Sequence, residues 1–506
     1  MKKVLSHIMA VALVILVSCF MPLFLFFTNI SSIKFVEIAI FMGAFSAIGL
    51  ILFAIIKGIT KSEYKAATIA AIVTLIYQNI GRLQPLIGPW FVILLFAAIM
   101  VGIYFAAKKF LSNDIAKTFA PILTIMLALL CILNTVTSMS KIVDKANLED
   151  KVKAEIDKNY ETLLSYKDEN ETPQELPNVY FFIPDEYAGF KSSEKFLGYD
   201  NKEFKDFLYS NNFQISESST NYSNGTLECL ADVFNFEINE DNRYNKASEA
   251  YCQKKVYDST LFRMVEDLGY DVRAFQPTDL VAYESETSQT GKLWSTTADG
   301  DLSLDLMLEP TICYPIKDAF MSVLDLFTDD ASIGKGVIDK LATSNAEPLM
   351  YFASKDAEYR DSTFNFCYSL IPHQPFYFDE EGNLKETNKY LNDWSTKDHY
   401  LEQYKYSTKL LTQSIENIIE NDPESIIIIM SDHGLRMHEV GRDTWMKDMT
   451  PRDNADIICA VYYKGEDFTD IEGLCGTNVL ISVVNEAYGY DIPIVGQSDD
   501  FYFKNE

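Results

Sequence analysis

The sequence has few positively charged residues for its length. Among 506 residues there are 43 lysines and arginines against 72 aspartates and glutamates, which gives a formal net charge of −29. Proteins that bind nucleic acids neutralise phosphates with lysine and arginine, so we expect no nucleic acid among the partners. Net charge says little about a local pocket, and it leaves open which smaller ligands the protein binds.

Histidines and paired cysteines are also scarce. The sequence has 5 histidines, and none of its 8 cysteines forms a CxxC pair. Six cysteines lie beyond residue 140, and an even number there permits disulfides without giving their connectivity. Cys367 and Cys459 fall in apolar runs typical of strands, where a small buried thiol is the simpler interpretation.

Long apolar segments are concentrated in the first 140 residues. Five of them follow one another, at about Val4–Phe27, Phe35–Ile56, Ala66–Ile80, Trp90–Ala107 and Thr118–Val136. Most reach the roughly 20 residues that a helix needs to cross a hydrocarbon core of about 30 Å. The pattern predicts an N-terminal polytopic α-helical membrane domain of about five helices over residues 1–140, with an uncleaved first helix.

Lysines in the connections between these segments predict the orientation of the membrane domain. They cluster in every second connection, at residues 2–3, 57–65 and 108–117, whereas the other connections carry only Lys34 and Arg82. The positive-inside rule places the lysine-rich connections in the cytoplasm. With five spans, or with the third and fourth as one re-entrant hairpin, everything after residue 140 is then extracytoplasmic.

The sequence changes character beyond residue 140. Residues 141–176 are charged and favour helix, which predicts a juxtamembrane helix and linker. Further on, apolar runs such as NVYFFI (178–183), FNFCYSLI (364–371) and SIIIIM (425–430) alternate with helical patterns. Continuous apolar strands separated by helices predict an α/β domain with a mostly parallel sheet covered by helices on both faces. Such sheets bind ligands at the carboxyl ends of their strands.

Two of the predicted strands end in acidic residues. Asp185 and Glu186 follow the first run, and Asp432 and His433 follow the third. Because parallel strands deliver their carboxyl ends to one edge, these side chains could bind a divalent cation through oxygen and nitrogen ligands. Each motif alone has a structural alternative. Asp-His-Gly could be a turn in which Gly434 has a positive φ and Asp432 caps its own backbone, and an acid after a strand could cap the next helix.

Four motifs in a fixed order resemble a known family. PNVYFFIPDEYAG, NYSNGTLECLADVFN, IPHQPF and IIIIMSDHG follow one another over residues 177–434. This order is similar to that of the sulfatase-like branch of the alkaline phosphatase superfamily, and in particular to membrane-anchored lipoteichoic acid synthases and phosphoethanolamine transferases. Those proteins carry five transmembrane helices and an extracellular catalytic domain. The resemblance implies a transmembrane domain (1–140), a juxtamembrane linker (141–176) and an extracellular sulfatase-like catalytic domain (177–506).

The resemblance also implies roles for individual residues. One divalent metal ion (Mn, Zn or Mg) would be bound by Asp185, Thr226, Asp432 and His433, with Thr226 also the nucleophile. The substrate-binding residues would be His373, which would contact the substrate phosphate, with Arg436, Glu186 and Trp294 as further candidates. The sequence has Asp185 where the synthases carry glutamate, and at Asn224–Gly225 it has one residue more than the family commonly shows. The structural alternatives are an N-cap for Thr226 and a buried histidine for His373.

The residue types fit phosphoryl transfer. A threonine hydroxyl is too weakly acidic to attack phosphorus unaided at neutral pH, and a divalent cation would stabilise its alkoxide. A helix beginning at Thr226 would direct its positive end at the phosphate. No C/S-x-P-x-R motif lies near Thr226, which argues against a formylglycine sulfatase. Only His438 follows His433 among the histidines, which favours one metal over two.

These observations predict extracytoplasmic, metal-dependent transfer of a phospho-alcohol group of the phosphoglycerol or phosphoethanolamine type. The donor would be a membrane phospholipid, the acceptor a glycan or lipid, and the intermediate a phosphothreonine. Two alternatives stay open: a phosphodiesterase or sulfatase-like hydrolase at the same site, and a catalytically silent membrane protein that binds glycan. The presence of Asp185, Thr226, Asp432 and His433 together argues against the silent protein.

An enzyme reporter that is active only outside the cytoplasm tests the predicted orientation. We expect activity when it is fused after residue 140 and none when it is fused after Ser62, because the lysines near Ser62 favour the cytoplasmic side. Labelling of residues beyond 140 from the cytoplasm would contradict the functional prediction as a whole.

Overall fold

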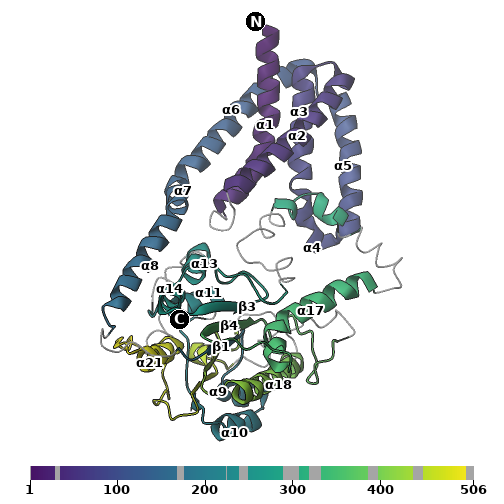
Figure 1. Cartoon of the computed structure of the whole chain (residues 1–506). Coiled ribbons are helices and arrows are strands. Elements are labelled where there is room, and N and C mark those ends of the chain that lie inside the picture. Colours follow the sequence, from purple (N-terminus) through teal and green to yellow (C-terminus); the bar gives the residue numbers. More distant parts are fainter. Residues whose placement is uncertain are drawn as a thin grey trace. The chain divides into compact units, whose positions relative to one another are not determined.

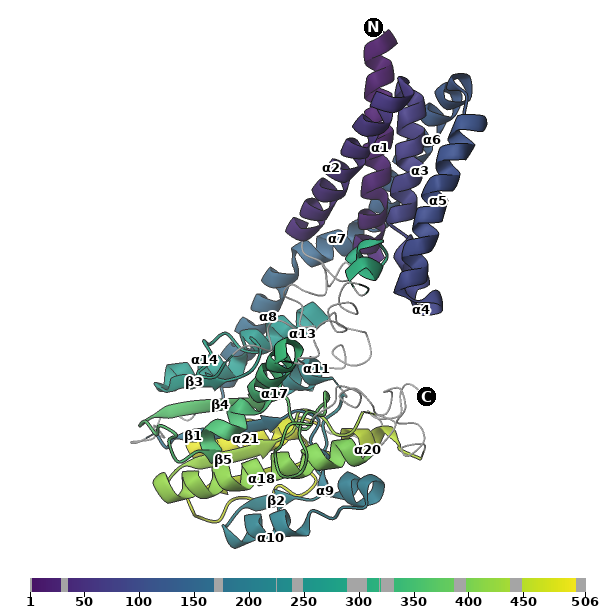
Figure 2. The same ribbon diagram turned by 90° about the vertical axis from the view of Figure 1, so that its right-hand side faces the viewer.

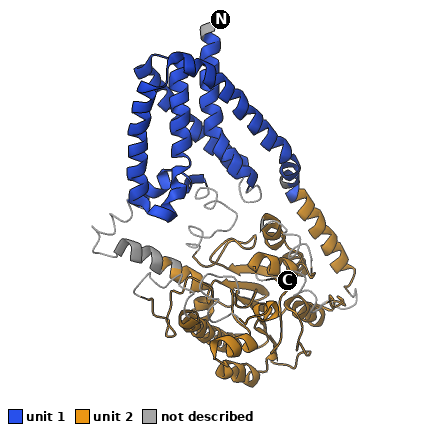
Figure 3. Cartoon of the chain, turned by 180° about the vertical axis from the view of Figure 1, so that it is seen from behind, with its two compact units in different colours: residues 1–148, 296–333 blue, residues 149–295, 334–506 orange. Residues whose placement is uncertain are grey.

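The computed structural model describes residues 2–28, 35–167, 176–223, 225–238, 249–288, 307–317, 319, 332–385, 397–436 and 448–496. The chain divides into two compact units, one of residues 1–148 with 296–333 and one of residues 149–295 with 334–506 (Figure 3). The bounds 1–140, 141–176 and 177–506 stay a prediction, and the described residues of 296–333 pack with the N-terminal helices.

The first unit consists of helices (Figure 1). Their bounds are α1 (Lys2–Thr28), α2 (Phe35–Thr60), α3 (Glu63–Tyr77), the 3₁₀ helix η1 (Ile80–Leu83), α4 (Gln84–Ile87), α5 (Pro89–Lys109), α6 (Asn113–Thr137) and α7 (Met139–Ala146). Helices α1, α2, α5 and α6 are long and apolar enough to cross a membrane, and α3 with Ile80–Ile87 makes a fifth if this bent pair is one span. The predicted multi-pass membrane domain of about five helices is confirmed.

Helix α3 is short, and small side chains explain how it packs among longer helices. The alanines at positions 66, 67, 70 and 71 are fully buried. They share one apolar cluster with Leu13, Val14 and Val17 of α1. Small residues let helices in a membrane domain approach closely. The segment with the weakest sequence signal for a span is therefore covered by protein.

Residues 307–317, from the middle of the chain, bind the irregular backbone that follows α3. The Gly81 amide donates to the Pro310 carbonyl at 2.8 Å, and the Ile312 amide donates to the Tyr77 carbonyl at 2.8 Å. Irregular backbone in a membrane domain needs such protein partners, because hydrocarbon offers none. The buried apolar side chains of this contact include Tyr77, Ile80, Met307 and Ile312. Residues 307–317 thus complete the helical unit.

The second unit contains a six-stranded sheet with helices (Figure 2). Its strands are β1 (Val179–Pro184), β2 (Gln214–Ser216), β3 (Asp271–Phe275), β4 (Thr363–Ser369), β5 (Ile426–Met430) and β6 (Cys459–Tyr463). Its helices are α8 (Leu148–Leu164), α9 (Phe190–Ser192), the π-helical turn η2 (Ser193–Leu197), α10 (Lys202–Ser210), α11 (Thr226–Val233), α13 (Glu249–Tyr257), α14 (Thr260–Leu268), α17 (Ser332–Ala353), α18 (Lys397–Asn421), α20 (Pro451–Ala455) and α21 (Gly476–Tyr488).

The sheet is mostly parallel, as the sequence predicts. The strand order is β2-β6-β5-β1-β4-β3. The pairs β1–β4, β1–β5 and β3–β4 are parallel, whereas β6 runs antiparallel to both β5 and β2. An antiparallel edge on a parallel sheet is common in α/β proteins.

Both faces of the sheet are buried, which explains why its strands are continuously apolar. Tyr180 and Phe182 of β1 face a cluster that includes residues of α17 and α18. Phe181, between them, packs instead against Phe234 after α11 and against Phe366 of β4. All six residues of β1 are buried. The α/β domain with helices on both faces is confirmed.

The cysteines form no disulfides. All eight fall within described residues and all are free thiols. Cys367 in β4 and Cys459 in β6 are buried, as their apolar surroundings in the sequence predict.

Substitution of Gly81 tests whether residues 307–317 belong to the helical unit. A Cβ on Gly81 would lie 2.3 Å from the carbonyl oxygens of Glu309 and Thr311, so Gly81→Ala forces the segment away. We expect the unfolding free energy to fall by about 1–3 kcal/mol, the usual cost of overpacking. The measurement is thermal unfolding of the full chain in detergent. Gly102→Ala in α5 is the control, because its Cβ meets nothing within 4 Å; equal stability of the two variants would contradict the contact.

Candidate functional site

Three neighbouring parallel strands end at one edge of the sheet. In the pairing of β1 with β5, Phe182 lies opposite Ile429. Asp185 and Asp432 each follow three residues after that pair, so the register itself brings the two acids together. On its other side, β1 pairs with β4, whose penultimate residue is Tyr368.

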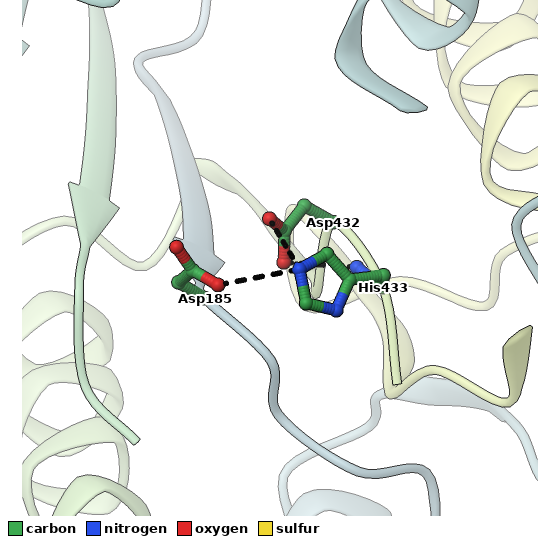
Figure 4. A group of neighbouring side chains, drawn as sticks. All are labelled: Asp185, Asp432 and His433. Carbon is green, nitrogen blue, oxygen red and sulfur yellow. Dashed lines mark hydrogen bonds and ion pairs between the residues drawn. The ribbon is translucent and has the colours of Figure 1, made fainter. Parts of the chain in front are cut away.

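Asp185, Asp432 and His433 form a compact buried cluster. His433 Nε2 lies 3.5 Å from Asp185 Oδ1 and 3.5 Å from Asp432 Oδ2 (Figure 4). All three side chains are buried. One ligand atom from each residue lies within 4.8 Å of the other two, which is close enough for a single ion to contact all three.

Each carboxylate has one oxygen fixed by the protein and one without a hydrogen-bond partner. Asp185 Oδ2 accepts from the Tyr368 hydroxyl at 2.5 Å. Asp432 Oδ1 accepts from the backbone amides of Glu186 at 3.0 Å and His433 at 2.8 Å. The remaining oxygens, Asp185 Oδ1 and Asp432 Oδ2, are buried and have no partner. Buried polar atoms without a partner are costly, and a divalent cation with oxygen ligands would satisfy both.

The protonation states of these groups fit a cation. His433 Nδ1 lies 2.8 Å from the Gly434 carbonyl and therefore carries the proton, which leaves the lone pair of Nε2 toward the two acids. Burial lowers the pKa of His433 and keeps it neutral. Burial and the neighbouring Asp432 raise the pKa of Asp185 well above its ordinary value. A bound cation would favour the ionised carboxylate and reverse that shift.

The turn alternative for Asp-His-Gly accounts for only part of this geometry. Asp432 does accept from the next backbone amide, but its second oxygen takes no part in the turn. Gly434 does not have the positive φ that the alternative requires. A glycine is needed there because a Cβ would lie 2.3 Å from the Asp456 carbonyl oxygen.

Thr226 begins helix α11 beside this cluster. Its N-cap is Gly225, so the N-cap alternative for Thr226 is wrong. Burial raises the pKa of Tyr368 well above its ordinary value and the charges of Asp185 and Asp432 add to this, whereas a side-chain hydrogen bond with Thr226 acts in the opposite direction. Thr226 therefore adjoins the phenol that binds Asp185. Asn224, in the insertion before it, lies outside the described residues.

The first turn of α11 approaches the second acid as well. The pKa of Cys229 is raised well above its ordinary value, first by burial and then by the charge of Asp432. Asn221, in the loop before the helix, donates from Nδ2 to the backbone carbonyls of Asp432 at 2.6 Å and Ser431 at 3.2 Å. The loop that precedes Thr226 is thus bound to the turn that carries Asp432.

Arg436 connects the cluster to His373 and Glu186. Its Nη2 donates to His433 Nε2 at 2.9 Å, and its Nη1 donates to His373 Nε2 at 3.1 Å. Its backbone amide donates to Glu186 Oε1 at 2.9 Å. Burial acts to lower the pKa of Arg436, but the charges of Glu186, Asp185 and Asp432 outweigh it and the pKa is raised. A permanent cation therefore sits against the candidate metal site.

His373 is neutral and positioned by its backbone neighbour. Its Nδ1 lies 2.5 Å from the Gln374 carbonyl, so Nδ1 donates and Nε2 is the atom that accepts from Arg436. Burial lowers the pKa of His373 to about 4. The structure thus places His373 and Arg436, both suggested by the sequence, side by side, whereas Trp294 and His438 lie outside the described residues.

Glu186 supports the cluster through its backbone. Its φ of +59° lies in the left-handed region, which a non-glycine residue adopts only when its surroundings hold it there. Its amide binds Asp432, and its carbonyl accepts from the Tyr400 hydroxyl at 2.7 Å. The side chain is fully buried. Glu186 therefore orients Asp432 and Arg436 from a strained position.

Sequence reasoning missed Tyr368 and Asn221. Tyr368 lies in the apolar run FNFCYSLI, where an aromatic residue is typical of the core. Its role follows only from the pairing of β1 with β4, which the sequence pattern does not specify. Asn221 lies in a quoted motif, but its partners are backbone carbonyls far along the chain.

Comparison with known proteins gives distant structural matches. No protein-family model matches this chain, and no curated protein matches it. The chain is similar to the C-terminal periplasmic domain of EptC from Escherichia coli in complex with zinc, at 16% identity, with 64% of this chain and 86% of that chain covered and a TM-score of 0.38. It is similar to the integral membrane lipooligosaccharide phosphoethanolamine transferase A of Neisseria meningitidis, at 12% identity, with 89% and 88% covered and a TM-score of 0.33.

A third match is the lipoteichoic acid synthase LtaP of Listeria monocytogenes. The identity is 14%, 68% of this chain and 81% of that chain are covered, and the TM-score is 0.36. Another match is described as a protein in the alkaline phosphatase superfamily from Vibrio parahaemolyticus. These are the protein classes that the four motifs resemble. At such identities and TM-scores the matches carry no argument of their own, and the functional argument rests on this chain's residues.

Loss of either acid tests the metal site. Asp185→Asn and Asp432→Asn each remove a charge from the buried cluster, so we expect metal affinity to fall by roughly ten-fold or more. The measurement is the metal content of the purified full chain by mass spectrometry. Asp271→Asn is the control, because Asp271 is exposed at the start of β3. Wild-type metal content in both cluster variants would show that the cluster is not the binding site.

Proposed function

We propose that this protein is an extracytoplasmic, metal-dependent phosphotransferase. It would move a phospho-alcohol group, of the phosphoglycerol or phosphoethanolamine type, from a membrane phospholipid to a glycan or lipid acceptor. The observation that supports the proposal is the side-chain hydrogen bond between Thr226 and Tyr368, whose hydroxyl in turn binds Asp185, one of two buried carboxylates that each have one oxygen without a hydrogen-bond partner. Helices suited to cross a membrane in the same chain support a lipid donor.

A divalent metal ion would be bound by Asp185, Asp432 and His433, with the Thr226 hydroxyl as a further ligand. When bound, it would supply positive charge that stabilises the threonine alkoxide and the phosphoryl group. Tyr368 holds Asp185 through its hydroxyl, and the Glu186 amide holds Asp432. These two contacts orient the acids without using the oxygens that face His433.

The reaction would proceed in two displacements at phosphorus. In the first, Thr226 Oγ1 forms a bond to phosphorus while the bond between phosphorus and the lipid alcohol oxygen breaks, and the threonine proton passes to that alcohol. In the second, an acceptor hydroxyl attacks phosphorus, the bond to Thr226 breaks, and the acceptor's proton returns to Thr226. Water in place of the acceptor would make the same site a phosphodiesterase.

Arg436 would provide fixed positive charge for the phosphoryl oxygens. Guanidinium groups bind phosphate oxygens through charge-assisted hydrogen bonds, and partial burial strengthens them. Neutral His373 accepts from Arg436 Nη1 and so would act on the phosphate through the orientation of that guanidinium. Helix α11 begins at Thr226 and adds the positive end of its dipole.

Substitution of Thr226 tests the covalent step. Thr226→Ala removes the nucleophilic oxygen, so we expect transfer to be lost while metal binding remains, at a stability cost of about 1 kcal/mol for the lost hydrogen bond with Tyr368. Thr226→Ser keeps a hydroxyl and should retain part of the activity. The measurement is intact mass of the full chain after incubation with candidate phospholipids, where the wild type should gain one phospho-alcohol group.

Two outcomes would contradict this mechanism. One is near-normal transfer by Thr226→Ala, and the other is an adduct on a different residue. An adduct on Thr226 that is released only to water, with every glycan and lipid acceptor tried, would favour the hydrolase over the transferase.

A further inference from the structure

The His433 ring has one nitrogen lone pair, on Nε2, and both Arg436 and a metal ion could bind it. Its Nδ1 proton is committed to the Gly434 carbonyl, so Nε2 is the only ring atom able to accept a hydrogen bond or bind a metal. In the structure Nε2 accepts from Arg436 Nη2 at 2.9 Å. The same atom lies 3.5 Å from each acid of the cluster. A metal bound by all three residues requires this lone pair, and Arg436 has to release it.

We infer that Arg436 competes with the metal ion for His433 and sets the metal affinity of the site. Two effects act in the same direction. The hydrogen bond to His433 Nε2 must break before the metal binds, and the guanidinium adds a positive charge beside the incoming cation. Arginine keeps its charge at any ordinary pH, so this opposition is permanent.

Two contacts of Arg436 can persist when the guanidinium leaves His433. Its backbone amide remains bound to Glu186 Oε1, and its Nη1 can keep the bond to His373 Nε2. Nη2, displaced from His433, then needs a new acceptor. This part rests on the proposed function: the displaced Nη2 would donate to an oxygen of a phosphoryl group bound next to the metal.

This arrangement couples the two ligands. Phosphate supplies the acceptor that Arg436 loses to the metal, so phosphate should strengthen metal binding and metal should strengthen phosphate binding by the same factor. Without phosphate, the wild-type site should bind metal less tightly than the same two acids and histidine would bind it in the absence of Arg436. Arg436 would thus favour metal retention when a phosphorylated ligand is present.

The test measures Mn²⁺ and Zn²⁺ affinity of the full chain in detergent, by competition with a chelating dye, with and without inorganic phosphate. Arg436→Gln removes both the charge and the Nη2 donor. We expect it to bind metal about ten-fold more tightly or better than wild type, as for loss of a charged hydrogen bond, and to lose the gain from phosphate. Arg360→Gln is the control, because Arg360 precedes β4 at the opposite end of that strand and pairs with Glu358.

Wild-type or weaker metal affinity in Arg436→Gln, with unfolding temperature preserved, would overturn the inference. If that variant does not fold, Arg436→Met decides: its side chain carries neither the charge nor an N–H donor, so tighter metal binding than wild type is expected and equal or weaker binding overturns the inference. No effect of phosphate on the wild type would overturn the reorientation alone. Metal affinity is measured without turnover. The competition between Arg436 and the metal can therefore be tested even if Thr226→Ala retains transfer activity.

Discussion

The parallel pairing of β1 with β5 is the constraint on which the candidate site depends. Its register places Phe182 opposite Ile429 and therefore brings Asp185 and Asp432 together at the carboxyl edge of the sheet. The strands are held there by burial of both faces, so the acids have little freedom to separate. Hydrophobic packing thus forces two carboxylates into one buried volume. The free-energy cost is large, because their charge is buried without full compensation.

The surrounding residues offset that cost only in part. Tyr368 satisfies one oxygen of Asp185, and the amides of Glu186 and His433 together satisfy one oxygen of Asp432. Arg436 supplies a positive charge nearby. The other two carboxylate oxygens keep no hydrogen-bond partner. Charge that the fold brings together but does not satisfy is typical of sites for cations. The membrane unit contributes differently: its helices account for anchorage, and residues 307–317 close the break after α3.

The sequence predicted the parts of this structure that apolar runs encode directly. Strands β1, β4 and β5 are continuous and buried, Asp185 follows β1, and Asp432 and His433 follow β5, so the fold class and the cluster could both be expected. Strand β2 has three residues and gives no such signal. The antiparallel direction of β6 leaves no trace in its composition, because a strand buried on both faces is apolar in either direction. The role of Tyr368 and the hydrogen bond from Arg436 to His433 depend on the tertiary structure, so no local sequence pattern predicts them.

A structure of the full chain with Mn²⁺, located by its anomalous scattering, tests the central claim most directly. The account predicts one ion coordinated by Asp185 Oδ1, Asp432 Oδ2 and His433 Nε2, with the Thr226 hydroxyl in the same coordination shell and Arg436 no longer bound to His433. An ion bound elsewhere, or an ion at the cluster with Thr226 turned away from it, would contradict the account.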